Sequence, residues 1–158
     1  VYVLGDFEVV QRGDRWTIVP AARYGPLRNW QALGAPFYPW EMKYAKRFKV
    51  NGVAGKSYYV KADRWTGSLV EVWVNGRKAG IVFAEPYTLD VTPFVRKGKN
   101  DVELRVVGNM ENLIGPHHVA YDGIVDPNRW NVPQLRKASE YFLTPFGLQE
   151  DFALVECE

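Results

Sequence analysis

Aromatic side chains are the residues of this sequence that suggest chemistry most clearly, and that chemistry is binding. They make up 15% of the 158 residues, with six tryptophans and nine tyrosines. An electron-rich ring stacks well on the polarised C–H face of a pyranose, so both residue types are common in sugar-binding surfaces. Large apolar side chains are mostly buried, so core packing accounts for most of the aromatic residues. The candidates for binding are those outside regular strands.

Two long irregular segments, residues 20–40 and 108–139, combine aromatic and polar side chains. Long loops in compact domains usually serve a function or cover the end of a sheet. We expect sugar rings to stack on four platforms, Trp30, Trp40, Tyr121 and Trp130. We expect their hydroxyl groups to be held by Arg23, Asn112 and Arg129, with His118 as a further ligand contact.

Metal and catalytic chemistry have weaker support. His117 and His118 are adjacent, so on an extended chain they point to opposite sides and do not readily chelate one ion. A zinc site there would need carboxylates such as Glu111 or Asp122. A glycosidase needs two carboxylates facing each other across a sugar. The acids expected in loops are Asp63, Glu85, Asp122 and Asp126. Their spacing does not single out a pair, so we predict no catalytic residue.

Composition excludes several other classes of protein. The net charge is +2, too small to indicate a nucleic-acid partner. No apolar run has the length that crosses a bilayer, so no membrane association is expected. Cys157 is the single cysteine, which permits no internal disulfide. The chain suits one domain over residues 1–158, and because it does not begin with methionine we expect it to be a piece of a longer protein.

The segment 68–107 predicts the scaffold that positions these residues. Two of its runs alternate apolar and polar residues with the period of a half-buried strand. Asn75-Gly76 predicts a two-residue hairpin turn after the first run. Thr92 and Pro93 predict a helix N-cap followed by proline at the first helical position. The predicted inward side chains are Val70, Val72, Val74, Val102, Leu104 and Val106.

Alternation and turn residues indicate more strands on both sides of this segment. The predicted fold class is therefore all-β, an antiparallel sandwich. We predict strands at 1–10, 16–19, 41–50, 57–62, 78–84, 141–148 and 152–156, and one helical turn at 27–33.

A longer motif runs through the same scaffold. It reads V-x-V-N-G-x-x-A-G from Val72, P-Y-x-L-D-V-T from Pro86, and G-x-N-x-V-E-L-R-V from Gly98. It closely resembles the sugar-binding, galactose-binding-like jelly roll of family-two and related glycoside hydrolases. The run from Asn112 to His118 is similar to a segment of large rhamnosidase-like glycosidases. The resemblance covers about residues 36–155.

The resemblance implies a jelly-roll β-sandwich that has no catalytic residues of its own, because in such enzymes these lie in a separate barrel domain. It also implies a secreted or periplasmic protein. Such sandwiches often hold a structural calcium ion, for which Asp151 resembles the acidic ligand; no other cofactor is required.

We therefore expect a monomeric, non-catalytic carbohydrate-binding module whose partners are a polysaccharide or oligosaccharide and the catalytic domain of its parent enzyme. Two alternatives remain open from the sequence. One is a structural accessory domain whose aromatic loops pack against the catalytic domain and bind no sugar. The other is a small glycoside hydrolase or lyase.

Overall fold

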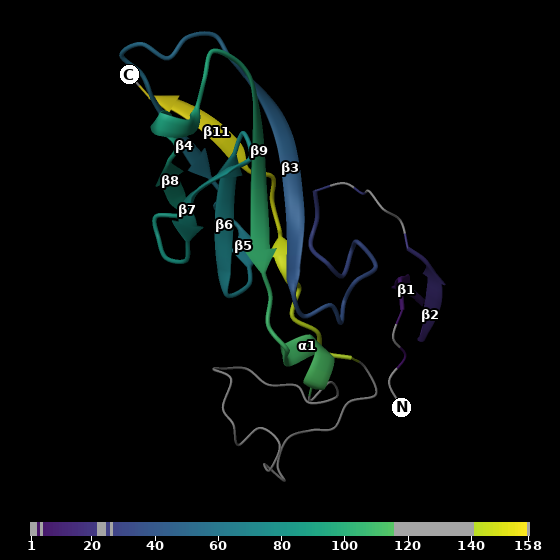
Figure 1. Ribbon diagram of the computed structural model, residues 1–158. Helices are drawn as coiled ribbons and strands as arrows, with labels where there is room; N and C mark the ends of the chain where they lie inside the picture. Colours follow the sequence, from purple (N-terminus) through teal and green to yellow (C-terminus); the bar gives the residue numbers. More distant parts are fainter. Residues whose placement is uncertain (1–2, 4, 22–24, 26, 116–140, 158) are drawn as a thin grey trace.

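Two antiparallel sheets pack face to face in the computed structural model, which describes residues 3, 5–21, 25, 27–115 and 141–157 (Figure 1). The larger sheet has the order β3 (Glu41–Val50), β9 (Gly98–Val107), β6 (Leu69–Val74), β7 (Arg77–Val82). The smaller sheet has the order β11 (Ala153–Cys157), β4 (Ser57–Lys61), β8 (Thr88–Asp90). The predicted all-β sandwich is confirmed.

Smaller elements surround the sandwich. In Figure 1 the hairpin of β1 and β2 stands beside the larger sheet, and α1 lies at the end of the sandwich where β3 begins. The hairpin is attached through Val9, whose N–H donates to the Gly34 carbonyl at 2.6 Å. The elements are β1 (Phe7–Arg12), β2 (Arg15–Pro20), the paired β5 (Trp65–Thr66) and β10 (Gly147–Leu148), the 3-10 turn η1 (Thr92–Phe94) and α1 (Glu111–Ile114).

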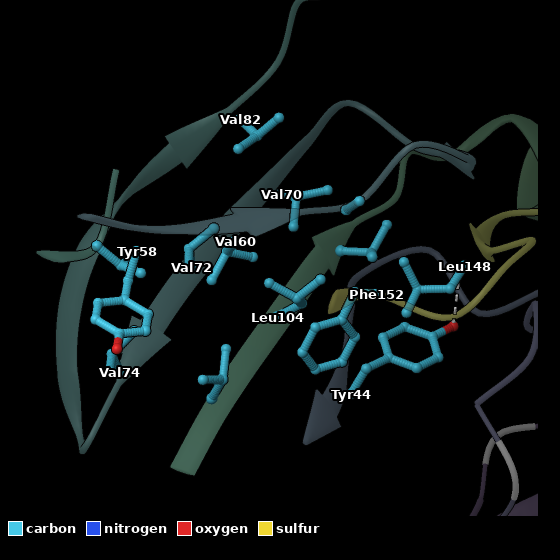
Figure 2. Packing of buried hydrophobic residues seen from close by; sticks show 14 of the residues in the cluster. Tyr44, Tyr58, Val60, Val70, Val72, Val74, Val82, Leu104, Leu148 and Phe152 are labelled. Carbon is cyan, nitrogen blue, oxygen red and sulfur yellow. Dashed lines mark hydrogen bonds between the residues drawn. The ribbon is translucent and has the colours of Figure 1, made fainter. Parts of the chain in front are cut away.

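The core lies between the two sheets, as the alternating pattern predicts. All six predicted inward side chains of β6 and β9 are 0% exposed. Tyr58 and Val60 of β4 meet them from the other sheet, and Tyr44, Leu148 and Phe152 close one end (Figure 2). Burial of this apolar surface is the main force that holds the sheets together.

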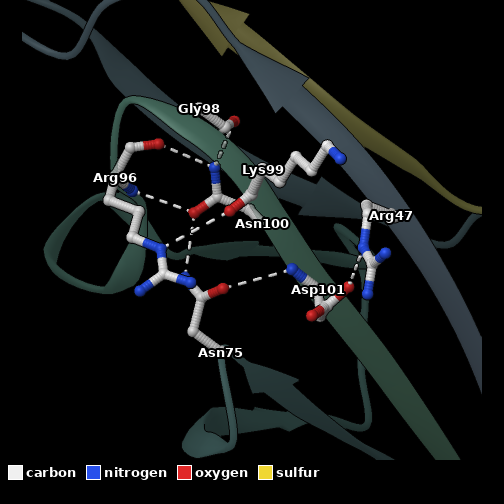
Figure 3. Close-up of polar contacts among 7 residues, drawn as sticks. All are labelled: Arg47, Asn75, Arg96, Gly98, Lys99, Asn100 and Asp101. Atoms are coloured by element: carbon white, nitrogen blue, oxygen red, sulfur yellow. Dashed lines mark hydrogen bonds and ion pairs between the residues drawn. The ribbon is translucent and has the colours of Figure 1, made fainter.

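The predicted hairpin turn between β6 and β7 is present. Asn75 has φ 52° and Gly76 has φ 79°, the left-handed pair that a two-residue turn needs. The amide of Asn75 donates to the buried Asn100 side chain at 2.9 Å, and Asn100 in turn accepts from the Arg96 N–H and donates to its carbonyl (Figure 3). This amide network ties the hairpin to the loop that leads into β9.

The structure corrects three local predictions. Thr92 is the first residue of η1, and Val91 is the cap residue. The Thr92 N–H donates to the Asp90 carboxylate at 2.9 Å, and the Thr92 hydroxyl accepts from the Tyr58 N–H. The strand predicted at 141–148 is reduced to β10, because a strand forms only where β5 supplies a hydrogen-bonding partner. Within 27–33, residues 30–33 form hydrogen-bonded turns in place of a helix.

Within the described ranges, no helix has the length and apolar character that crossing a membrane demands.

Candidate functional site

The predicted platforms Trp30 and Trp40 have opposite environments. Trp30 is 1% exposed and belongs to the core, with its ring 5.5 Å from that of Phe146 and 5.8 Å from that of Tyr38. Its predicted stacking role is therefore wrong, because no face of the indole is open to a ligand. Trp40 is 62% exposed, at the start of β3, where its carbonyl accepts from the Gly108 N–H at 2.6 Å. Its indole is available for stacking.

Asn112 does not offer its amide to solvent. It is 4% exposed, and its Nδ2 donates to the carbonyls of Pro36 and Thr144 at 2.8 and 2.7 Å. Its Oδ1 accepts from the Thr144 N–H at 2.9 Å. The predicted contact with ligand hydroxyl groups is corrected to a structural one: Asn112 joins α1 to two neighbouring loops.

Five predicted ligand contacts lie outside the described residues, and the structure says nothing about them: Arg23, His118, Tyr121, Arg129 and Trp130. Their roles stay predictions.

Asp151, the predicted calcium ligand, has a protein cation beside it. Its Oδ2 lies 2.6 Å from Lys46 Nζ, which also donates to the Phe152 carbonyl at 3.3 Å and lies 5.2 Å from the centre of the Phe48 ring. Calcium takes six to eight oxygen ligands. Among residues whose placement is described, no three acidic, histidine or cysteine side chains gather as a metal site. Asp151 is thus paired with an ammonium group in this structure, and its role as a calcium ligand stays a prediction.

The sequence analysis missed a groove of about 350 Å³ beside the β1–β2 hairpin, which we call the hairpin groove. Its lining includes one indole and three amide side chains, from Trp16, Gln11, Asn29 and Gln31. Asn29 is held in place, since its Oδ1 accepts from the Ala32 N–H and its Nδ2 donates to Gln149 at 3.2 Å. The sequence assigned Trp16 to a strand, and only the tertiary structure brings β2 next to residues 29–32.

Trp16 is supported from behind by other rings. Its ring centre lies 6.0 Å from that of Phe37 and 5.9 Å from that of Tyr141, and these two rings are themselves 5.9 Å apart. Edge-to-face contacts of this kind contribute to stability beyond the buried area. Phe37 and Tyr141 therefore position the indole that lines the hairpin groove.

A second groove of about 400 Å³ lies on the outer face of the larger sheet, and we call it the sheet groove. Its lining includes Trp73, Ala45 and two ion pairs. Arg47 Nε lies 2.6 Å from Asp101 Oδ1, which holds the pKa of that carboxyl below its usual range. The second pair is Arg105 Nε with Glu103 Oε1 at 2.5 Å, and the hydrogen bond raises the pKa of Arg105.

Similar proteins agree with this fold. No family model matches the chain. A putative β-glucuronidase of Formosa agariphila is 30% identical over 129 residues, 77% of this chain and 11% of that protein. The rhamnosidase of Novosphingobium sp. PP1Y matches with a TM-score of 0.56 and 26% identity over 95% of this chain and 14% of that one. Bifidobacterium dentium β-glucuronidase has a similar fold (TM-score 0.53, 19% identity, 88% of this chain and 24% of that chain).

The fold is thus a β-sandwich domain of the type contained in rhamnosidases and β-glucuronidases, and the predicted resemblance is confirmed. The chain spans between 11% and 24% of the length of these three relatives. Its relatives are glycoside hydrolases, and its match to a small part of each fits an accessory domain of such a protein.

Proposed function

We propose that this domain is a non-catalytic carbohydrate-binding domain of a larger glycoside hydrolase, and that the hairpin groove is its binding site. The observation that carries the proposal is the pairing of an indole, Trp16, with the amides of Gln11, Asn29 and Gln31 in one groove. An indole offers a flat face to a sugar ring, and amides donate and accept hydrogen bonds without imposing a charge.

The relatives suggest which saccharides to test first. One is named a rhamnosidase, and another was solved with coumarin-3-O-glucuronide. Polysaccharides that contain rhamnose or glucuronic acid are therefore the first candidates for this domain. Trp40, 62% exposed, is a second aromatic contact to test alongside the groove.

Affinity electrophoresis through polysaccharide gels tests the proposal. The parent chain is expected to be retarded by at least one rhamnose- or glucuronate-containing polysaccharide. Gln31→Ala removes an amide at an exposed position, and Trp16→Ala removes the ring; each should weaken retardation about tenfold, a loss of roughly 1.4 kcal/mol. Phe83→Ala, which removes a 74% exposed ring outside the groove, serves as the control and should behave like the parent.

Trp16 also packs against Phe37 and Tyr141, so its removal can unfold the domain. If Trp16→Ala does not fold, the binding of Gln31→Ala alone tests the site. Migration of the parent chain unaffected by every polysaccharide would contradict the proposed function. Retardation that Gln31→Ala leaves unchanged would move the binding site elsewhere.

The apolar side chains around α1 favour a second candidate function, a structural domain that packs against the rest of its enzyme. Met110 is 47% exposed and Ile114 is 54% exposed, and Phe142 at 44% follows in the segment that Asn112 joins to α1. An exposed patch of this kind commonly marks a protein contact. Concentration-dependent self-association that Ile114→Ser abolishes, together with no retardation in the gels, would favour this function over sugar binding.

A further inference from the structure

The outer face of the larger sheet presents an ordered array of charged side chains around one indole. Register pairs Trp73 of β6 with Glu103 of β9, and Glu103 with Ala45 of β3. Arg47 pairs with Asp101 in the same way. Paired residues of an antiparallel sheet point to the same side. Ala45 and Gly76 are the smallest residues in the lining of the sheet groove, and Glu103 lies between Ala45 and Trp73 in the row.

Trp73 is held in a single orientation. Its Nε1 donates to Glu71 Oε2 at 3.1 Å, and Lys78 Nζ contacts the other oxygen of this carboxylate at 2.5 Å. The Arg105 guanidinium lies 4.1 Å from the centre of the indole and covers one of its faces. These contacts order the ring before any ligand arrives, which lowers the entropy cost of binding on it.

Four of the five charged residues that line the sheet groove form opposite pairs, and the fifth, Lys46, pairs with Asp151 outside the groove. Arg47 faces Asp101 and Arg105 faces Glu103, so the groove offers donors and acceptors in nearly equal number. An anionic ligand would meet two carboxylates, and a cationic ligand two guanidinium groups. A sugar hydroxyl both donates and accepts, so an uncharged saccharide suits all four groups at once.

We propose that the sheet groove is a second carbohydrate-binding site, which holds an uncharged stretch of oligosaccharide against Trp73 and between the Arg47–Asp101 and Arg105–Glu103 pairs. The inference rests on the proposed function, since it adds a site to a domain that binds saccharide. Two sites on one domain increase the apparent affinity for a long polysaccharide through their effective concentration.

Titration calorimetry of the 158-residue chain with defined hexasaccharides tests this site. The uncharged probes are cellohexaose, xylohexaose and mannohexaose, and the anionic probe is hexagalacturonate. At least one uncharged probe is expected to bind more tightly than the anionic one. Trp73→Ala should reduce its affinity tenfold or more, and Ala45→Gln, which fills the groove at an exposed position without altering charge, should reduce it at least fivefold.

Lys49→Gln is the matched control, because Lys49 is an exposed residue of the same strand and face that does not line the groove. Gln31→Ala separates the two sites, since it alters the hairpin groove alone. Affinity that falls in Gln31→Ala and stays unchanged in Ala45→Gln would overturn the second site and leave the proposed function standing. Absence of binding by every hexasaccharide and polysaccharide would overturn both.

Two further results would also count against the sheet groove. Tighter binding of hexagalacturonate than of every uncharged probe would contradict the charge argument. If Ala45→Gln left saccharide affinity unchanged and altered only the self-association of the chain in sedimentation velocity, the groove would be a protein contact.

Discussion

At the scale of single residues, Lys46 forms an ion pair with Asp151, the residue that the sequence suggested as a calcium ligand. Its ammonium group contacts Asp151 and the Phe152 carbonyl and lies near two aromatic rings. Lys46→Met should lower the free energy of unfolding by about 1 kcal/mol, since the ion pair is partly exposed. Thermal unfolding measures this, with Lys43→Met on the outer face as the control.

The same experiment tests the metal. Calcium and a chelator should leave the midpoint of unfolding of the parent unchanged. A rise in the midpoint with millimolar calcium, reversed by the chelator, would show that the ion binds and that Lys46 does not replace it.

Tyr44 gives the fold a dependence on alkaline pH. Burial raises the pKa of Tyr44 to about 12, against an ordinary value of 10.0, while its hydroxyl donates to the Arg28 carbonyl at 2.8 Å. The folded state holds this proton more tightly than the unfolded state. The contribution of the Tyr44 hydroxyl to the free energy of unfolding is therefore complete below pH 10 and is lost as pH rises towards 12. Unfolding in urea at pH 9 and pH 11 should show this fall, and Tyr44→Phe should show a smaller one.

The sequence predicted the buried residues of the core better than it predicted the residues that line the candidate binding site. The sequence marks Trp30 and Trp40 alike, as tryptophans in one irregular segment, yet one is buried and the other exposed. Burial of a loop residue depends on the side chains that pack against it, which for Trp30 are Tyr38 and Phe146. Such partners cannot be predicted from the residues next to it in the sequence. Trp16 was missed because only the tertiary structure brings β2 next to the residues with which it lines the hairpin groove.

At the scale of elements, alternation and turn chemistry predicted most of the sandwich. The strand expected at 41–50 is β3 with the same bounds, and the Asn75-Gly76 turn joins β6 and β7. Both patterns are local, so they are visible in sequence. The strand expected at 141–148 shrank to two residues because its pairing depends on β5, which is distant in the chain.

Asn100 is the residue on which the loop before β9 depends. It is 0% exposed, and its amide serves Asn75, Arg96 and Gly98 together (Figure 3). Asn100→Leu should cost about 2–4 kcal/mol, because several buried backbone and amide groups lose their partners. Denaturant titration measures the loss, and Lys99→Leu, an exposed neighbour, should change little. Equal stabilities for the two variants would contradict this role of Asn100.

At the scale of the whole molecule, the sandwich and the β1–β2 hairpin are separable. Among the residues that the structure describes, Trp30 is the first buried member of the core in sequence, and residues 3 and 5–20 contribute none. A chain that starts at residue 21 should therefore keep a cooperative unfolding transition and lose binding at the hairpin groove. Circular dichroism and gel retardation measure the two effects, and loss of cooperative unfolding would show that the hairpin belongs to the core.

The irregular pairing of β6 with β7 determines on which face of the larger sheet Lys78 lies. Between Val72 and Trp73 the register with β7 shifts, so that Lys78 stands opposite Trp73. Uninterrupted pairing would set Lys78 opposite Val74, whose side chain is 0% exposed, and would drive an ammonium group between the sheets. Deletion of the extra residue, Ala79, would make the pairing continuous with Lys78 still opposite Trp73. We therefore expect the deletion to keep the ammonium group outside and to cost only the packing of Ala79 against the core.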